Sequence, residues 1–226
     1  MKIEERLHAL AEAPYADFQR RLVETRFPIL GVRMPALRKL AKELVRQEDW
    51  PAIACAQSFS SYEEVMLSGL VIASASCAEE ERIRLLCGFL PFIDNWAICD
   101  CVASSVKTAP KKRERYLPFI DECLRSPHEF TIRFALVLLL AHFVEADLLP
   151  RIFAATDGLS HPGYYVKMGA AWLLSVCFVK YPEETMAYFQ QNTLDDATFN
   201  KSLQKILESN RVDGETKQII RSMKRK

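Results

Sequence analysis

Apolar and polar residues follow one another along the chain with the spacing of amphipathic helices. After Pro35, residues 36–44 place apolar side chains three or four positions apart, and proline in a first turn suits a helix start. Ser61 and Glu64 have the S-x-x-E spacing of a capping box, which predicts another helix start. Further helices are expected at 78–92, 94–106, 112–126, 128–145, 147–157, 163–180, 182–192, 195–210 and 213–224. No stretch shows convincing strand alternation, so the pattern predicts an all-α fold.

The longer apolar helices recur at a nearly constant interval. Similar segments begin at 65, 96, 132, 167 and 199, which are offsets of 31, 36, 35 and 32 residues. Each is followed by a shorter and more amphipathic segment, as in helix-pair repeats whose units cannot bury their apolar faces alone. We therefore predict a HEAT-like helical-repeat solenoid, an α-α superhelix. It would be a single domain over 1–226, with two or three capping helices in about residues 1–60 and stacked pairs over 61–224.

The repeat also brings unusual residues to equivalent places on its inner helices. Trp96 and Asp100 stand in one repeat, Arg133 in the next, and Lys167 with Trp172 in the one after. These places span about 140° of one helix face, so side chains from three repeats are expected to converge on the concave side. The alternative is structural: both tryptophans would be core residues, and Asp100 would pair with Arg133.

Composition narrows the class of protein. Half of the residues are hydrophobic, which excludes a disordered chain. The most apolar stretch, 134–143, is about half of a membrane span, and no signal-peptide pattern opens the chain, so we expect a soluble, cytoplasmic protein. The seven cysteines lie mostly at apolar helical positions and are expected to be buried thiols. The four histidines lack metal-ligand spacing, so no metal site is predicted.

Five longer segments stand in a recognisable order and spacing over about 180 residues. They are ILGVRMPALRKLAK (29–42), NWAICD (95–100), TIRFALVLLLAHF (131–143), YYVKMGAAWLLSVCFVKYPE (164–183) and DDATFNKSLQKILESNR (195–211). In these segments the sequence resembles the bacterial DNA alkylation repair family of HEAT-like glycosylases, the AlkD-type proteins. The resemblance implies excision of cationic N3- and N7-alkylated purines from duplex DNA, without a pocket for the damaged base.

The same resemblance implies a role for each candidate residue. Asp100 would stabilise the sugar as positive charge develops on it, and Trp96 and Trp172 would offer apolar faces to the sugar and backbone. Three basic side chains are the expected phosphate contacts, Arg133 first and then Lys167 and Arg33.

Three functions remain open at this stage. The first is a monomeric glycosylase that acts on alkylated double-stranded DNA without a metal, a cofactor or a membrane. The second is a non-catalytic module that binds DNA and senses damage, and the third is a protein-interaction scaffold. The presence of Asp100 with both tryptophans favours the enzyme. A net charge of only +1 favours the other two, because proteins that bind duplex DNA are usually plainly basic.

Overall fold

A computed structural model describes residues 2–47, 49–107 and 110–225. Over these residues the chain forms fourteen α-helices and three short 3-10 helices, and no strand. The all-α, helical-repeat class predicted from the sequence is confirmed. The chain divides into two compact units, Met1–Phe119 and Ile120–Lys226, which are described separately below. The prediction that 1–226 is one domain stays a prediction.

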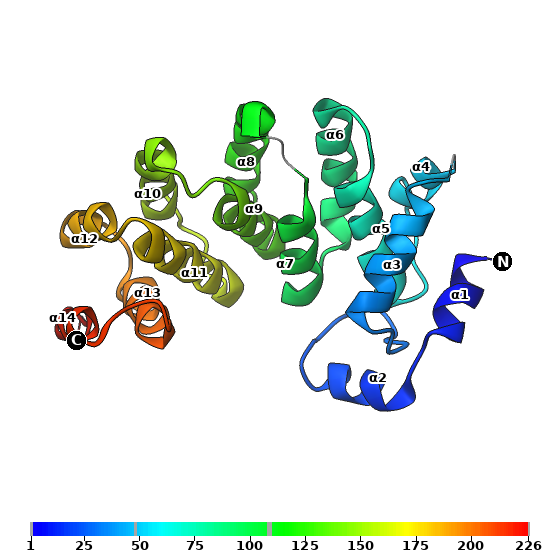
Figure 1. Ribbon diagram of the computed structural model, residues 1–226, viewed down its shortest axis with the longest axis horizontal. Coiled ribbons are helices and arrows are strands. Elements are labelled where there is room, and N and C mark those ends of the chain that lie inside the picture. The colour runs from blue at the N-terminus through cyan, green and yellow to red at the C-terminus, as the bar shows by residue number, and fades with distance from the viewer. Residues whose placement is uncertain (1, 48, 108–109, 226) are drawn as a thin grey trace. The chain divides into compact units, whose positions relative to one another are not determined.

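The first unit is built around one nearly buried helix, α5 (Tyr62–Ser74), on which residues 65–73 are all buried. α3 (Met34–Leu44) and α7 (Trp96–Ser105) pack against it, and α6 (Glu79–Phe89) also contacts it (Figure 1). The remaining elements are α1 (Ile3–Ala9), α2 (Ala13–Arg20), α4 (Trp50–Ala54), η1 (Leu90–Phe92), η2 (Pro110–Tyr116) and α8 (Leu117–Leu124), which begins in this unit.

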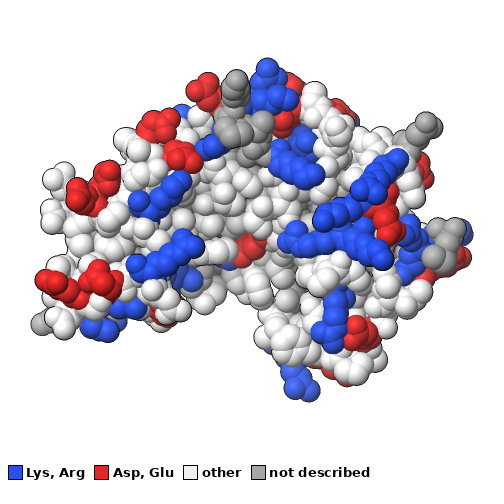
Figure 2. Space-filling view, in the orientation of Figure 1, with Lys and Arg blue, Asp and Glu red and all other residues white. Residues whose placement is uncertain are grey.

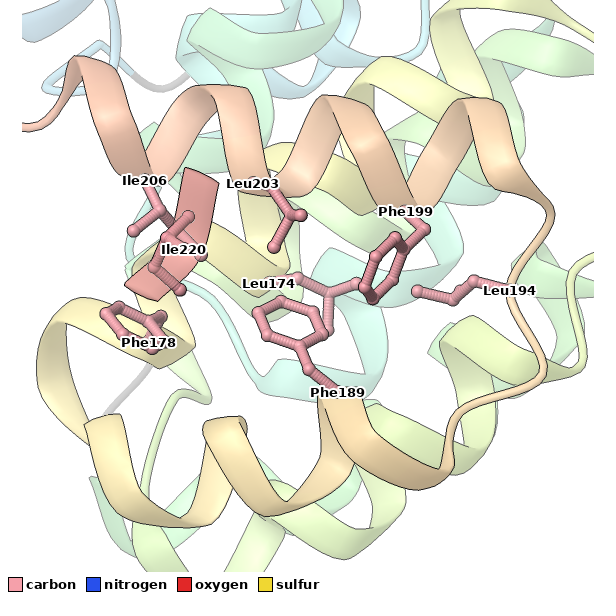
Figure 3. Close-up of a cluster of buried hydrophobic side chains, with 8 residues drawn as sticks. All are labelled: Leu174, Phe178, Phe189, Leu194, Phe199, Leu203, Ile206 and Ile220. Atoms are coloured by element: carbon pink, nitrogen blue, oxygen red, sulfur yellow. The ribbon is translucent and has the colours of Figure 1, made fainter. Parts of the chain in front are cut away.

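The second unit repeats this plan around α11 (Tyr164–Lys180), which packs against α9 (Glu129–His142) and α13 (Asp196–Glu208). Its other elements are η3 (Ala146–Leu148), α10 (Leu149–Asp157), α12 (Pro182–Gln191) and α14 (Gly214–Ser222). Figure 3 shows the core between them, where side chains from α11, α12, α13 and α14 meet. The cluster consists of Leu174, Phe178, Phe189, Leu194, Phe199, Leu203, Ile206 and Ile220.

Two expectations about helices are wrong in detail. The helix expected at 112–126 begins as the 3-10 helix η2 and becomes α-helical only at Leu117. The described part of residues 1–60 holds four helices where two or three were expected. One of them, α3, packs directly on α5 and so resembles the inner helix of a further pair.

The predicted capping box at the start of α5 is half correct. Ser61 Oγ accepts a hydrogen bond from the Glu64 backbone N–H at 3.2 Å, as expected. The Glu64 carboxylate, however, accepts from the backbone N–H of Ser60 at 2.7 Å and not from that of Ser61. The reciprocal bond is therefore shifted by one residue.

The cysteines are all thiols, but not all are buried. Cys99, Cys123 and Cys177 lie in the interior as expected. Cys55 and Cys87 are exposed, which corrects the prediction. Cys55 follows the five-residue helix α4, and Cys87 lies on the solvent side of α6. Among the described residues, no three His, Cys, Asp or Glu side chains are grouped to hold a metal ion.

No helix within the described residues combines the length and the apolar character needed to cross a bilayer.

Candidate nucleic-acid interface

Trp96 is held at the first turn of α7 by two local contacts. The side chain of Asn95, which is buried, caps the helix by accepting from the Ile98 N–H at 3.0 Å. Trp96 itself is half-buried, and its indole Nε1–H donates to the carbonyl of Leu22 at 3.3 Å. The ring is therefore fixed at the edge of the first unit.

Asp100 lies one turn after Trp96 on α7 and is also half-buried. Residues four apart share a helix face, so its carboxylate and the Trp96 ring project on the same side. The Ser104 hydroxyl donates to the backbone carbonyl of Asp100 at 2.6 Å, so this hydrogen bond does not involve the side-chain carboxylate. The expected pairing of Trp96 and Asp100 on one face is therefore compatible with the structure of α7.

Arg38, which sequence reasoning did not select, reaches from α3 to the same helix. Its Nη1 donates to Ser105 Oγ at 3.1 Å and its Nη2 to Cys101 Sγ at 3.5 Å. Both of these acceptors are neutral, so they leave the charge of the guanidinium uncompensated. Figure 2 shows basic side chains gathered over α3, the helix that also carries Lys39 and Lys42. The first unit thus places positive charge beside α7.

The loop between α2 and α3 is anchored by two acidic side chains. Asp94 accepts from Thr25 Oγ1 at 2.9 Å and from the Arg26 N–H at 2.7 Å. Glu63, which is completely buried, accepts from the backbone N–H groups of Leu30, Gly31 and Val32 at 2.7 to 3.2 Å. Together they fix the loop that holds Leu22 against Trp96 and that leads to Arg33.

Gly31 is required where this loop passes the start of α2. Its φ is +91°, and a Cβ at this position would lie 2.4 Å from the carbonyl oxygen of Glu12. Any other residue would therefore be strained by both backbone conformation and contact.

Arg33 is exposed but already has an acidic partner. Its Nε and Nη2 donate to the Glu12 carboxylate at 2.8 and 2.9 Å, and its guanidinium lies 4.7 Å from the centre of the Tyr15 ring. The hydrogen bond to Glu12 raises the pKa of Arg33, and the same bond lowers the pKa of Glu12. A phosphate at Arg33 would have to compete with this carboxylate.

Arg133, in the second unit, is 6% exposed and lies between α9 and α11. Its Nη1 donates to the Tyr165 carbonyl at 2.9 Å, and Glu129 accepts from the Tyr165 N–H at 2.5 Å. The two side chains therefore fasten the start of α11 to α9. Because guanidinium carries five N–H donors, a phosphate contact would use a nitrogen other than the one that binds Tyr165.

Lys167 stands on the first turn of α11 and pairs with α13. Its Nζ lies 3.1 Å from Asp195 Oδ1. Asp195 is the N-cap of α13, and its carboxylate also accepts from the backbone N–H groups of Ala197 and Thr198. Burial alone would raise the pKa of Asp195, but the hydrogen bonds from Thr198 and Lys167 outweigh it and lower that pKa.

Trp172 is half-buried on α11 and lines an open groove of about 700 Å³ along α11 and α13. The prediction that Trp172 is a core residue, which was the structural alternative, fails for this position. Three basic side chains share the groove with it: Lys180, Lys205 and Arg211.

The two units divide the predicted site between them. Trp96, Asp100 and Arg33 belong to the first unit, and Arg133, Lys167 and Trp172 to the second. Their convergence on one concave face stays a prediction. Arg38, Lys205 and Arg211 were missed. The repeat could have pointed to Lys205 as a candidate. In the repeat that begins at 199, this residue stands one place after the position equivalent to Trp172.

Comparison with known proteins places these features in a family context. The family model described as "DNA alkylation repair enzyme" matches residues 3–208, which is nearly the whole chain and includes every candidate side chain except Arg211. No curated protein matches the sequence.

Proposed function

Because the chain belongs to the DNA alkylation repair enzyme family, we propose that it is a DNA glycosylase that removes cationic N3- and N7-alkylated purines from duplex DNA. The observation that carries the proposal is the Trp96–Asp100 pair, which stands one turn apart on α7 within the matched region. The lesion would be held in an open groove, without a pocket that takes in the base.

The reaction needs little assistance from the protein because the alkylated base is already a good leaving group. When the bond between C1′ of the deoxyribose and the purine nitrogen breaks, its electron pair returns to the base, which departs neutral. The positive charge moves to the sugar. Water then adds to C1′ and loses a proton, and an abasic sugar remains in the strand.

Asp100 would act where this charge develops. A carboxylate about 4 Å from the sugar attracts a unit positive charge with on the order of 4 kcal/mol at an effective dielectric of about 20. It would also orient the water and accept its proton. Trp96, whose ring is fixed by the bond to Leu22, would support the sugar and exclude solvent on one side. Trp172 would do the same from the second unit.

Phosphate contacts would supply most of the affinity for duplex DNA. Arg133, Lys167 and Arg33 remain candidates, each of them next to a protein acceptor. Arg38 joins them because both of its hydrogen-bond acceptors, Ser105 and Cys101, are neutral.

Replacing Asp100 by Asn tests the catalytic role directly. The wild type should release N7-methylguanine from a methylated duplex, and Asp100→Asn should lower the rate by about 10²-fold or more. Affinity for the duplex should be kept or increased, because a negative charge has left the groove. The melting temperature should also be kept. Asp17→Asn, on the exposed surface of α2, is the matched control and should change none of the three.

The outcomes separate the competing functions. Duplex binding without release by the wild type would leave a damage-sensing module, and no binding even at low salt would leave a scaffold. An unchanged rate in Asp100→Asn removes this carboxylate from the mechanism. A large fall in melting temperature would make Asp100 a buried structural partner, since breaking such a pair costs about 3–5 kcal/mol.

A further inference from the structure

The groove beside Trp172 holds more positive charge than sequence analysis assigned to it. It is bounded on one side by α11 and on the other by the last turn of α13 and the residues that follow. Lys180, Lys205 and Arg211 line it against a single acidic side chain, Glu208. An excess of two positive charges in an open groove points to an anionic ligand.

The three cations differ in how the protein uses them. Lys180 Nζ donates to the Val144 carbonyl at 2.6 Å and pairs with Glu145 at 3.2 Å, so it ties α11 to the end of α9. By contrast, neither Lys205 Nζ nor the Arg211 guanidinium forms a hydrogen bond or an ion pair with any residue that the structure describes. These two charges are available to a ligand.

The cations predicted from the sequence differ from this pair. Arg133 donates to the Tyr165 carbonyl, and Lys167 pairs with Asp195. A ligand that bound Lys167 would compete with Asp195, and a ligand at Arg133 would have to share the guanidinium with the Tyr165 carbonyl. Lys205 and Arg211 would need only to give up water, which makes them the better placed phosphate contacts of the second unit.

We propose that Lys205 and Arg211 bind a phosphodiester of the duplex backbone whose deoxyribose packs against Trp172. This proposal rests on the function proposed above and extends it. An indole ring that lines the same groove as two cations matches a sugar followed by a phosphate. The planar guanidinium of Arg211 suits bidentate binding of phosphate oxygens, and Lys205 adds a compact charge. The open groove fits a polymer that enters and leaves it.

Glu208 adds one negative charge to the groove. Its Oε1 accepts from Gln204 Nε2 at 2.8 Å, which holds the carboxylate on the last residue of α13. A phosphate is repelled from this carboxylate. Removing this charge should therefore strengthen the binding of DNA.

The test measures binding of the full-length protein to an undamaged, fluorescently labelled duplex at several salt concentrations. Lys205→Gln with Arg211→Gln should weaken binding about tenfold or more at low salt. It should also flatten the slope of log affinity against log salt by about one, because losing the contact to one phosphate removes about one released counterion. Glu208→Gln should bind more tightly than the wild type.

A control with the same charge change distinguishes a local contact from a general field. Lys217→Gln with Arg221→Gln removes two charges from α14, outside the groove lining. Equal weakening by both double variants would overturn the proposal, and so would an unchanged salt slope in the first. Lys205→Arg with Arg211→Lys keeps the charges and should retain most of the binding, which excludes misfolding as the cause.

Failure of the wider function would look different. A wild type that does not bind duplex at low salt would overturn both proposals. A wild type that binds and excises, while the groove variant binds equally well, would overturn only this one.

Discussion

The first unit holds its helices together with buried charges, whereas the second relies on aromatic and aliphatic contacts. Glu63, Glu79 and Arg82 are buried in the first unit. Arg133 is the only charged residue among the buried ones described in the second, where the other buried polar side chains are hydroxyls. Where the first unit has buried charges, the second has the hydrophobic cluster of Figure 3 and a stacked pair of rings, Phe153 and Tyr188, whose centres are 4.2 Å apart.

The difference shows two ways to secure the ends of a helix in a repeat. In the first unit, Arg82 donates to the carbonyls of Ile72, Ala73 and Ala75 and so satisfies the end of α5. In the second, the start of α13 is closed by its own N-cap, Asp195, at the surface. A buried charge stabilises only while every partner is present, whereas an exposed cap acts alone.

Removing the Arg82 guanidinium should have the largest effect on stability. Arg82→Met removes the side-chain donor of three carbonyls at the end of α5 and a buried charge partner of Glu79, so unfolding should become easier by about 3–5 kcal/mol. Urea denaturation measures this change. Arg84→Met, which breaks an exposed ion pair with Glu81 and should change stability little, is the control on the same helix. Equal losses in the two variants would contradict the comparison.

A smaller effect is expected at the Asp195 cap of the second unit. Asp195→Ala removes the acceptor of the Ala197 and Thr198 N–H groups and should cost about 1 kcal/mol of stability. It also releases Lys167, so affinity for duplex DNA at low salt should rise. Asp213, at the N-cap of α14, pairs with no lysine that the structure describes, so Asp213→Ala should leave affinity unchanged. A fall in affinity for Asp195→Ala would show that Lys167 does not face the DNA.

The smallest effect concerns thiol reactivity and should leave stability untouched. Burial raises the pKa of Cys177, in the second unit, to about 12, so almost none of it is thiolate at pH 8. Cys123 is buried as well, whereas Cys55 and Cys87 of the first unit are exposed. Brief treatment of the native protein with iodoacetamide, followed by peptide mass spectrometry, should modify Cys55 and Cys87 and spare Cys123 and Cys177. Modification of Cys177 at the rate of Cys55 would show that the core of the second unit opens readily.

The positions of the long helices could be predicted because burial imposes a period on the sequence. α11 was expected at 163–180 and spans Tyr164–Lys180. The first turns of the helix expected at 112–126 could not be assigned in this way, because a 3-10 segment and an α-helix bury similar side chains over so short a stretch.

The candidate site was predictable only in part. Trp96 and Asp100 could be placed on one face because they lie four residues apart on one helix. The environment of Arg133 could not be predicted, because its hydrogen-bond acceptor is a main-chain carbonyl 32 residues away. Any residue at position 165 would offer the same carbonyl. Lys205 and Arg211 were overlooked for a related reason: sequence does not reveal which cations lack partners.

The anchors of the loop between α2 and α3 bear on how the chain folds as it is made. Asp94 lies 69 residues after Thr25, and Glu63 lies 32 residues after Gly31. During synthesis the amino end emerges first, so this loop leaves the ribosome well before either anchor. We expect the first two helices to remain undocked until α5 and then α7 have formed. The Trp96 side of the molecule would therefore be completed last within its unit, after the longest loop closures.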